Sequence, residues 1–187
     1  MIRKVKAKRK RKNPYLVEYG YHFTNDKDLK SIIKTGLVPG FRKGTRYAYI
    51  TNILKYFYNG RQPIYFNINK STDNWSNGML AHSENYKYNT WLKVNVRDFN
   101  QLPDIFMILD YGFEISNNNS IYLIDPDLYK DEDDDLYELL LKYNFKIPFK
   151  NLLKDKILQS AFINLTKSFC IDQRIPPKYI EEIIKVK

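Results

Sequence analysis

The sequence has few residues that form disulfides or bind metals. Its 187 residues include one cysteine, Cys170, and two histidines, His22 and His82. A single cysteine excludes an internal disulfide and a zinc site built from cysteines, and two isolated histidines are too few for a His-rich metal site. The acidic stretch 131–135 lacks the spaced ligands and the glycine of a calcium loop. We therefore expect no bound metal.

Long apolar segments are also missing. No apolar run approaches the roughly 20 residues that span a bilayer, and the N-terminus lacks the apolar stretch of a signal peptide. We expect an intracellular protein without a membrane partner. It would be cytoplasmic, or nuclear if the basic N-terminal segment is a targeting signal.

Aromatic and apolar residues are plentiful. Aromatic residues make up 16% of the chain and hydrophobic residues 43%. These fractions are typical of a folded chain, and the length suits one domain with a sizeable core. We predict a single domain over 14–187, preceded by a disordered arm over 1–13.

The net charge of +10 is concentrated in that arm. Eight lysines and arginines lie within residues 3–12, which leaves about +2 for the rest of the chain. Such a run cannot fold alone because its charges repel, and it attracts polyanions such as nucleic acid. A solubilising tail is the alternative. The residues that we expect to contact nucleic acid are Arg3, Lys4, Lys8, Arg9, Lys10, Arg11 and Lys12.

Residues 15–39 predict a strand followed by a short helix. The strand ends at His22-Phe23-Thr24, and Asn25 is suited to cap the helix by accepting a backbone N–H bond. Three apolar residues recur at helical spacing and form one expected buried stripe: Leu29, Ile32 and Ile33. Gly36 is placed to end the helix in a left-handed turn. His22 is thus held at a strand end, where it is either a functional residue or a structural histidine.

The rest of the chain mixes strands and helices, which predicts an α+β fold. Strands are predicted, or are candidates, over residues 63–69, 91–96, 105–109, 120–124 and 169–172. Helices are predicted over 136–143 and 152–165, with a closing helical turn over 179–184. The acidic residues before 136 complement the dipole of the helix that follows them. We interpret residues 125–165 as an acidic and helical insertion within the single domain.

Residues 40–52 form a loop with two glycines and three basic residues, Arg42, Lys43 and Arg46. This composition indicates a loop that closes over an anionic ligand, or an ordinary solvated loop. Residues 47–50 within it have the character of a short strand.

Four sequence blocks follow one another in a recognisable order. The first is Tyr21-His22-Phe23-Thr24, followed by a short helix and Gly36-Leu37-Val38-Pro39. The second is residues 47–51 with the strand at 64, the third is residues 91–104, and the last is 175–180. In this order they resemble ADP-ribosyltransferase-fold proteins, including the DNA ADP-ribosyltransferase toxins and the RNA 2′-phosphotransferases. The similarity covers most of residues 15–110 and the C-terminus.

The resemblance implies an ADP-ribosyltransferase-like split antiparallel sheet with short flanking helices and a C-terminal helical segment. It implies NAD as a substrate, with His22 bonding a ribose of NAD and Tyr49 packing on the nicotinamide. Thr24, Arg42 and Arg46 are the other residues that we expect to contact NAD. The implied function is NAD-dependent transfer of ADP-ribose to a nucleic acid or a protein.

The sequence departs from the family at the catalytic acid. Many relatives have a glutamate at the start of the strand that leads into the closing Ile-Pro-Pro, where a carboxylate stabilises an oxocarbenium-like transition state. Residues 167–174 contain no glutamate; Glu114 is the best substitute, and Asp172 and Gln173 are weaker ones. Two alternatives stay open. One is a non-enzymatic module that binds nucleic acid or a nucleotide, and the other is an NAD-dependent RNA 2′-phosphotransferase, which needs no glutamate.

Overall fold

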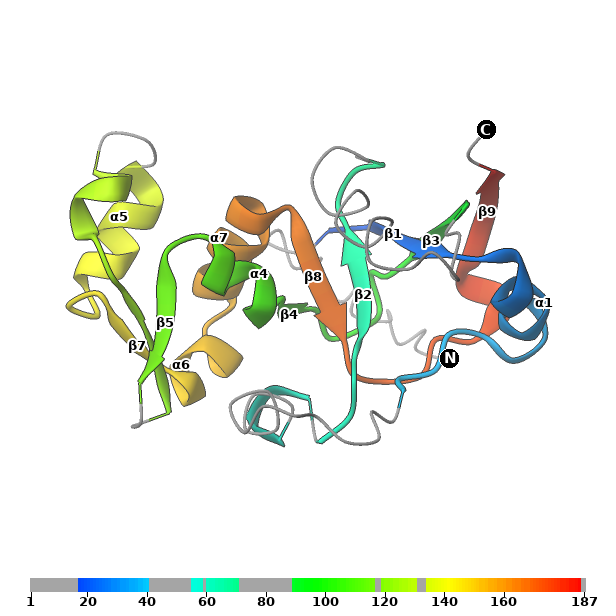
Figure 1. Cartoon of the computed structure of the whole chain (residues 1–187), viewed down its shortest axis with the longest axis horizontal. Coiled ribbons are helices and arrows are strands. Elements are labelled where there is room, and N and C mark those ends of the chain that lie inside the picture. The colour runs from blue at the N-terminus through cyan, green and yellow to red at the C-terminus, as the bar shows by residue number, and fades with distance from the viewer. Residues whose placement is uncertain are drawn as a thin grey trace, which may run out of the picture.

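The computed structural model describes residues 17–40, 55–58, 60–70, 89–116, 119–130 and 134–185. These residues form one six-stranded sheet, one three-stranded sheet and several short helices, so the fold is α+β (Figure 1). Within the described residues, no helix is long and apolar enough to cross a membrane.

The six-stranded sheet is antiparallel between all its neighbours and has the order β4-β8-β2-β1-β3-β9. Its strands are β1 (Tyr19–Thr24), β2 (Ile64–Asn67), β3 (Thr90–Asn95), β4 (Leu102–Pro103), β8 (Ser168–Ile171) and β9 (Ile180–Lys185). The sheet therefore joins strands from residues 19–103 to strands from residues 168–185.

The segment between β4 and β8 builds a separate layer, at the left of Figure 1. Its three-stranded antiparallel sheet consists of β5 (Phe113–Ser116), β6 (Ser120–Leu123) and β7 (Lys146–Pro148). Its helices are α4 (Ile105–Asp110), the 3-10 helix η1 (Pro126–Tyr129), α5 (Asp134–Leu141), α6 (Phe149–Lys154) and α7 (Lys156–Thr166). This layer begins at α4, well before residue 125, where we expected the insertion to start.

The described residues form two apolar cores, and the second also contains Leu102 and Cys170 of the large sheet. One face of the large sheet packs against Leu29 and Ile32 of α1 (Asp26–Thr35) and against Ile163 of α7. The alternating residues Leu92, Val94 and Val96 lie in that core, as their spacing predicted. The second core lies among the small sheet and its helices. Its fully buried members include Ile108, Phe113, Ile121, Leu140, Leu152 and Phe162.

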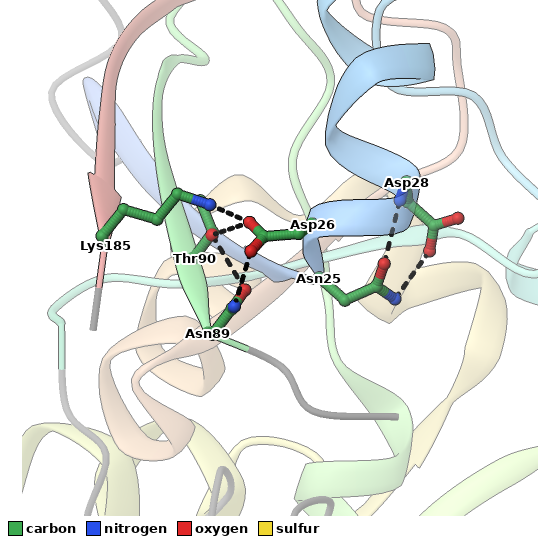
Figure 2. Close-up of polar contacts among 6 residues, drawn as sticks. All are labelled: Asn25, Asp26, Asp28, Asn89, Thr90 and Lys185. Carbon is green, nitrogen blue, oxygen red and sulfur yellow. Dashed lines mark hydrogen bonds and ion pairs between the residues drawn. The ribbon is translucent and has the colours of Figure 1, made fainter. Parts of the chain in front are cut away.

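Helix α1 is set by local sequence, as predicted. The Asn25 side chain accepts a bond from the Asp28 backbone N–H at 2.9 Å, and its amide donates to the Asp28 carboxylate (Figure 2). At the other end Gly36 adopts a φ of 82°, a conformation that favours glycine. The expected buried stripe is narrower than predicted, because Ile33 is half exposed while Leu29 and Ile32 contact the core.

A second cluster ties the start of α1 to the sheet. The Asp26 carboxylate accepts bonds from Asn89 Nδ2 at 2.9 Å and Thr90 Oγ1 at 3.3 Å, and it pairs with Lys185 at the end of β9 (Figure 2). Helix α1 is therefore anchored to β3 and β9 by one carboxylate.

Three predicted elements were wrong. Residues 105–109 form helix α4 and not a strand, because the Asp104 side chain caps the backbone N–H groups of Phe106 and Met107. The predicted helix over 152–165 is two helices, since Asp155 ends α6 and caps α7. Residues 180–185 form strand β9, preceded by the 3-10 turn η2 (Pro177–Tyr179), because they pair with β3.

Candidate functional site

The large sheet parts between β1 and β2. Strands β1 and β3 pair over six residues, whereas β1 and β2 share one residue pair, Tyr21 with Asn67. Beyond that pair, His22 Nδ1 lies 2.9 Å from the backbone oxygen of Tyr65. A side chain therefore spans the two strands at a place where a regular ladder would have backbone bonds.

A cavity of about 430 Å³ lies at this split. Its volume falls within the range of about 300–1,000 Å³ that is usual for small-molecule sites. Residues from both faces of the sheet line it, which fits a position between strands. His22, Thr24 and Phe66 line it together with α1, and so do Tyr21 and Tyr65, which alternate with them along the strands.

His22 is neutral in this setting. Burial lowers the pKa of its imidazole, although the bond to Tyr65 and the nearby Asp28 carboxylate oppose the shift. A carbonyl oxygen only accepts, so Nδ1 carries the hydrogen and donates it to Tyr65. In the neutral ring Nε2 is then an acceptor. The site can thus accept a hydrogen bond from a hydroxyl group of a ligand.

A row of polar residues crosses the face of the sheet opposite His22. Tyr21 is paired with Asn67, and Asn67 with Ser168. Pro103 pairs with Phe169, so the next residue of the chain, Asp104, lies opposite Ser168. The Ser168 hydroxyl points to Asp104 Oδ2 at 3.5 Å. We call Tyr21, Asn67, Ser168 and Asp104 the polar row; all four line the cavity.

Aromatic rings lie beside the polar row. Phe23 stacks on Trp91 with ring centroids 4.4 Å apart, and Tyr65 occupies the neighbouring strand. All three line the cavity. Flat rings next to a row of hydrogen-bonding groups form a surface that suits a planar heterocycle carrying polar edges.

Asp104 is the buried carboxylate of the polar row. It is 1% exposed, and its Oδ1 accepts the capping bonds from Phe106 and Met107 at 3.1 and 3.3 Å. Burial raises the pKa of Asp104 to about 7, although these backbone bonds and the Ser168 hydroxyl oppose the shift. This carboxyl group is therefore poised to gain or lose a proton at neutral pH.

The residues expected from the sequence fall into three groups. His22 and Thr24 line the cavity, and Thr24 is buried there. Glu114 does not lie with them: it is in β5 of the small sheet, where the Tyr122 hydroxyl donates to its carboxylate. In Figure 1, β5 and α1 are at opposite ends of the molecule. The third group lies outside the described residues: Tyr49, Arg42 and Arg46, and the arm residues Arg3, Lys4, Lys8, Arg9, Lys10, Arg11 and Lys12.

Sequence reasoning missed Asp104 and Ser168 as site residues. The aspartate follows Leu102-Pro103 at the end of the block 91–104. One signal for it was present, because an aspartate directly before an apolar run is a frequent helix cap. Its place in the cavity, however, depends on the pairing of β4 with β8, which are 64 residues apart at Asp104 and Ser168.

Searches of protein-family models, of curated proteins and of solved structures found no match to this chain.

Proposed function

We propose that this chain is an NAD-dependent ADP-ribosyltransferase of the ADP-ribosyltransferase-like fold, with NAD bound at the split between β1 and β2. The observation that carries the proposal is the neutral His22, fixed by Tyr65 at the wall of a cavity within a parted antiparallel sheet. A ribose hydroxyl is the kind of donor that its Nε2 would accept.

The cavity lining supports NAD further. The nicotinamide ring is flat and carries a polar amide, and the rings of Phe23, Tyr65 and Trp91 lie beside the hydroxyl and amide groups of the polar row. The carboxylates of Asp28 and Asp104 also line the cavity, and negative charge favours the positive charge that develops on the ribose when the nicotinamide bond breaks.

The acceptor of ADP-ribose is proposed to be a nucleic acid or a protein. The eight basic residues within 3–12 favour a nucleic acid, because a dense basic run binds phosphate backbones. Deleting residues 1–12 should therefore flatten the dependence of nucleic-acid affinity on salt.

A non-enzymatic nucleotide-binding module is the second candidate. It is favoured by the position of Glu114, which is exposed on the small sheet and does not line the cavity. On this account NAD or another nucleotide binds, and nothing is transferred.

The test is to incubate the purified chain with labelled NAD and with single-stranded DNA, RNA and protein acceptors. Label on an acceptor together with released nicotinamide supports the transferase. Saturable NAD binding without release supports the binding module. A product that carries a cyclic phosphate, formed from a 2′-phosphorylated RNA, would instead identify a phosphotransferase.

His22→Ala should weaken NAD binding about five- to tenfold, which corresponds to roughly 1–1.4 kcal/mol for a lost hydrogen bond. Asn95→Ala is the control, because Asn95 lies in β3 and does not line the cavity. Equal NAD affinities of the two variants in calorimetry would contradict the assignment of His22.

A further inference from the structure

We propose that Asp104 is the proton acceptor of the transfer reaction, held in place by its capping bonds to α4 and facing Ser168 at the end of the polar row. This inference rests on the proposed function. The sequence left the catalytic carboxyl group unidentified. This inference assigns it to Asp104, which reaches the cavity because β4 pairs with β8.

The position of Asp104 is the first argument. It stands opposite Ser168, where β8 begins, and β8 leads into the closing Ile175-Pro176-Pro177. A carboxylate is thus present beside the start of this strand, although it comes from another part of the chain. Both residues line the cavity that His22 also lines.

The hydrogen bonds of Asp104 are the second argument. The two short backbone contacts go to Oδ1, whereas Oδ2 has a long contact of 3.5 Å with the Ser168 hydroxyl. One oxygen therefore fixes the carboxyl group to the start of α4, and the other is directed to the polar row. The carboxyl group is thus oriented through Oδ1, while Oδ2 has this one long contact and further lone-pair capacity.

The surroundings of Asp104 are the third argument. Three titratable groups interact electrostatically with Asp104, so that the charge of one partner shifts the pKa of the other: Tyr58, Cys170 and Asp110. Burial raises the pKa of both the Tyr58 hydroxyl and the Cys170 thiol well above their usual values, so both are neutral near pH 7. Burial also brings the pKa of Asp104 to about 7, close to the working pH that suits a general base.

Asp104 takes the proton of a hydroxyl or amide group of the acceptor, and that oxygen or nitrogen forms a bond to C1′ of the ribose. The bond from C1′ to the nicotinamide nitrogen breaks, and its electron pair leaves with neutral nicotinamide. Asp104 then releases its proton to water, so each turnover yields one nicotinamide and one proton.

Asp104→Asn tests the assignment, because asparagine caps helices as well as aspartate but does not take a proton. Nicotinamide release and transfer should fall about 10²–10⁴-fold, the usual contribution of a general base, while NAD affinity in calorimetry stays close to that of the wild type. Asp155→Asn is the matched control, since Asp155 caps α7 in the same way and does not line the cavity. It should transfer at the wild-type rate.

Ser168→Ala tests the role of Asp104 through the pH dependence of the reaction. That dependence should change if Asp104 takes the proton and should stay the same if Asp104 is only structural. The Ser168 hydroxyl lowers the pKa of Asp104, so its removal should shift the rising limb of the pH–rate profile to higher pH. The carboxyl carbon of Asp104, followed by NMR in the protein without NAD, should show the same upward shift.

Different results would overturn the role of Asp104 alone or the proposed function as well. If the wild type transfers ADP-ribose and Asp104→Asn transfers equally well, this inference is overturned and the function stands. Loss of transfer in Glu114→Gln with full activity in Asp104→Asn would identify Glu114 as the acid. If the wild type neither binds NAD nor releases nicotinamide, both proposals are overturned.

Discussion

The six-stranded sheet and the three-stranded sheet use their faces in different ways. The large sheet has one face that is apolar around Phe66, Leu92 and Phe169. Its other face carries the polar row, and at β4 and β8 it also places Leu102 and Cys170 in the second core. The small sheet packs Phe113 and Ile121 into a core with α7, and its exposed side bears Glu114 and Tyr122. The cavity of about 430 Å³ at the split is lined by strands of the large sheet and by Asp104, the carboxyl group whose pKa is raised to about 7. The small-sheet layer has a hollow of about 420 Å³ between α5 and α7, which Asp104 does not line.

From this difference we expect the small-sheet layer to contribute mainly to stability and the split to contribute mainly to ligand binding. Closely packed core side chains contribute stability in proportion to the apolar area they bury. A sheet whose strands separate beside a row of polar groups leaves a cavity that a ligand could fill. We therefore expect substitutions in the small-sheet layer to change unfolding, and substitutions around the split to change ligand binding and pH dependence.

The largest effect should come from Phe162→Ala in α7. The ring is fully buried and packs edge-on against Phe113, with centroids 5.2 Å apart. Its loss should lower the free energy of unfolding by about 3–5 kcal/mol in urea denaturation, without a change in NAD affinity while the protein stays folded. Ile157→Ala in the same helix is the control, because Ile157 is 49% exposed. Similar costs for the two variants would show that this layer is not a packed core.

The pH dependence of stability should identify the buried carboxyl group at the split. The pKa of Asp104 is raised to about 7 by burial, so between about pH 4 and pH 7 the folded state holds a proton that the unfolded state has lost. This contribution to stability is complete below pH 4 and is lost as pH rises through 7. At about 1.4 kcal/mol per pKa unit, the change is on the order of a few kcal/mol.

Asp104→Asn removes this titration. Its free energy of unfolding should rise relative to that of the wild type as pH increases from 4 to 7, and the difference should then level off. Urea denaturation at several pH values measures it. Parallel curves for the two proteins over this range would contradict the burial of a titrating carboxyl group beneath the cavity.

The apolar face of the large sheet should be intolerant of one added methyl group. A Cβ at Gly20 would lie 2.7 Å from Phe169 and 2.8 Å from Phe66, whose rings stack and are almost fully buried. Gly20→Ala should therefore cost about 1–3 kcal/mol. At Gly40 the nearest atom among the described residues is the Gln62 Cβ at 3.8 Å, so Gly40→Ala should cost much less. If the two substitutions lowered the free energy of unfolding equally, the packing around Gly20 would be no tighter than the packing around Gly40.

Helix α1 and the alternating strands were predictable because short-range chemistry decides them. Asn25 caps α1 through a residue three positions away, and Gly36 ends it with a positive φ. The apolar run after Asp104 was ambiguous between strand and helix, and the cap decided for a helix. The last strand could not be predicted, because its residues have helical spacing and only pairing with β3 holds them extended.

The residues of the candidate site also differ in whether local sequence alone identifies them. His22 was visible because it stands at the end of a strand before a capped helix. Asp104 was not, because its place beside Ser168 depends on the pairing of β4 with β8 across 64 residues of sequence. Local patterns therefore located one wall of the cavity, and the opposite wall required the sheet order.

The smallest effect should come from the surface cluster that anchors α1 beside the split. The Asp26 carboxylate bonds to Asn89, Thr90 and Lys185, but the Asp26 and Lys185 side chains are 59% and 51% exposed. Exposed pairs contribute little, so Asp26→Ala should lower the free energy of unfolding by about 0.5–1 kcal/mol. Asp26→Asn keeps one acceptor oxygen, which can serve either Asn89 or Thr90, and should cost less. Because salt screens exposed charges, the difference between these variants should shrink at high ionic strength. A loss that is large and insensitive to salt would show that α1 depends on this carboxylate far more than its exposure indicates.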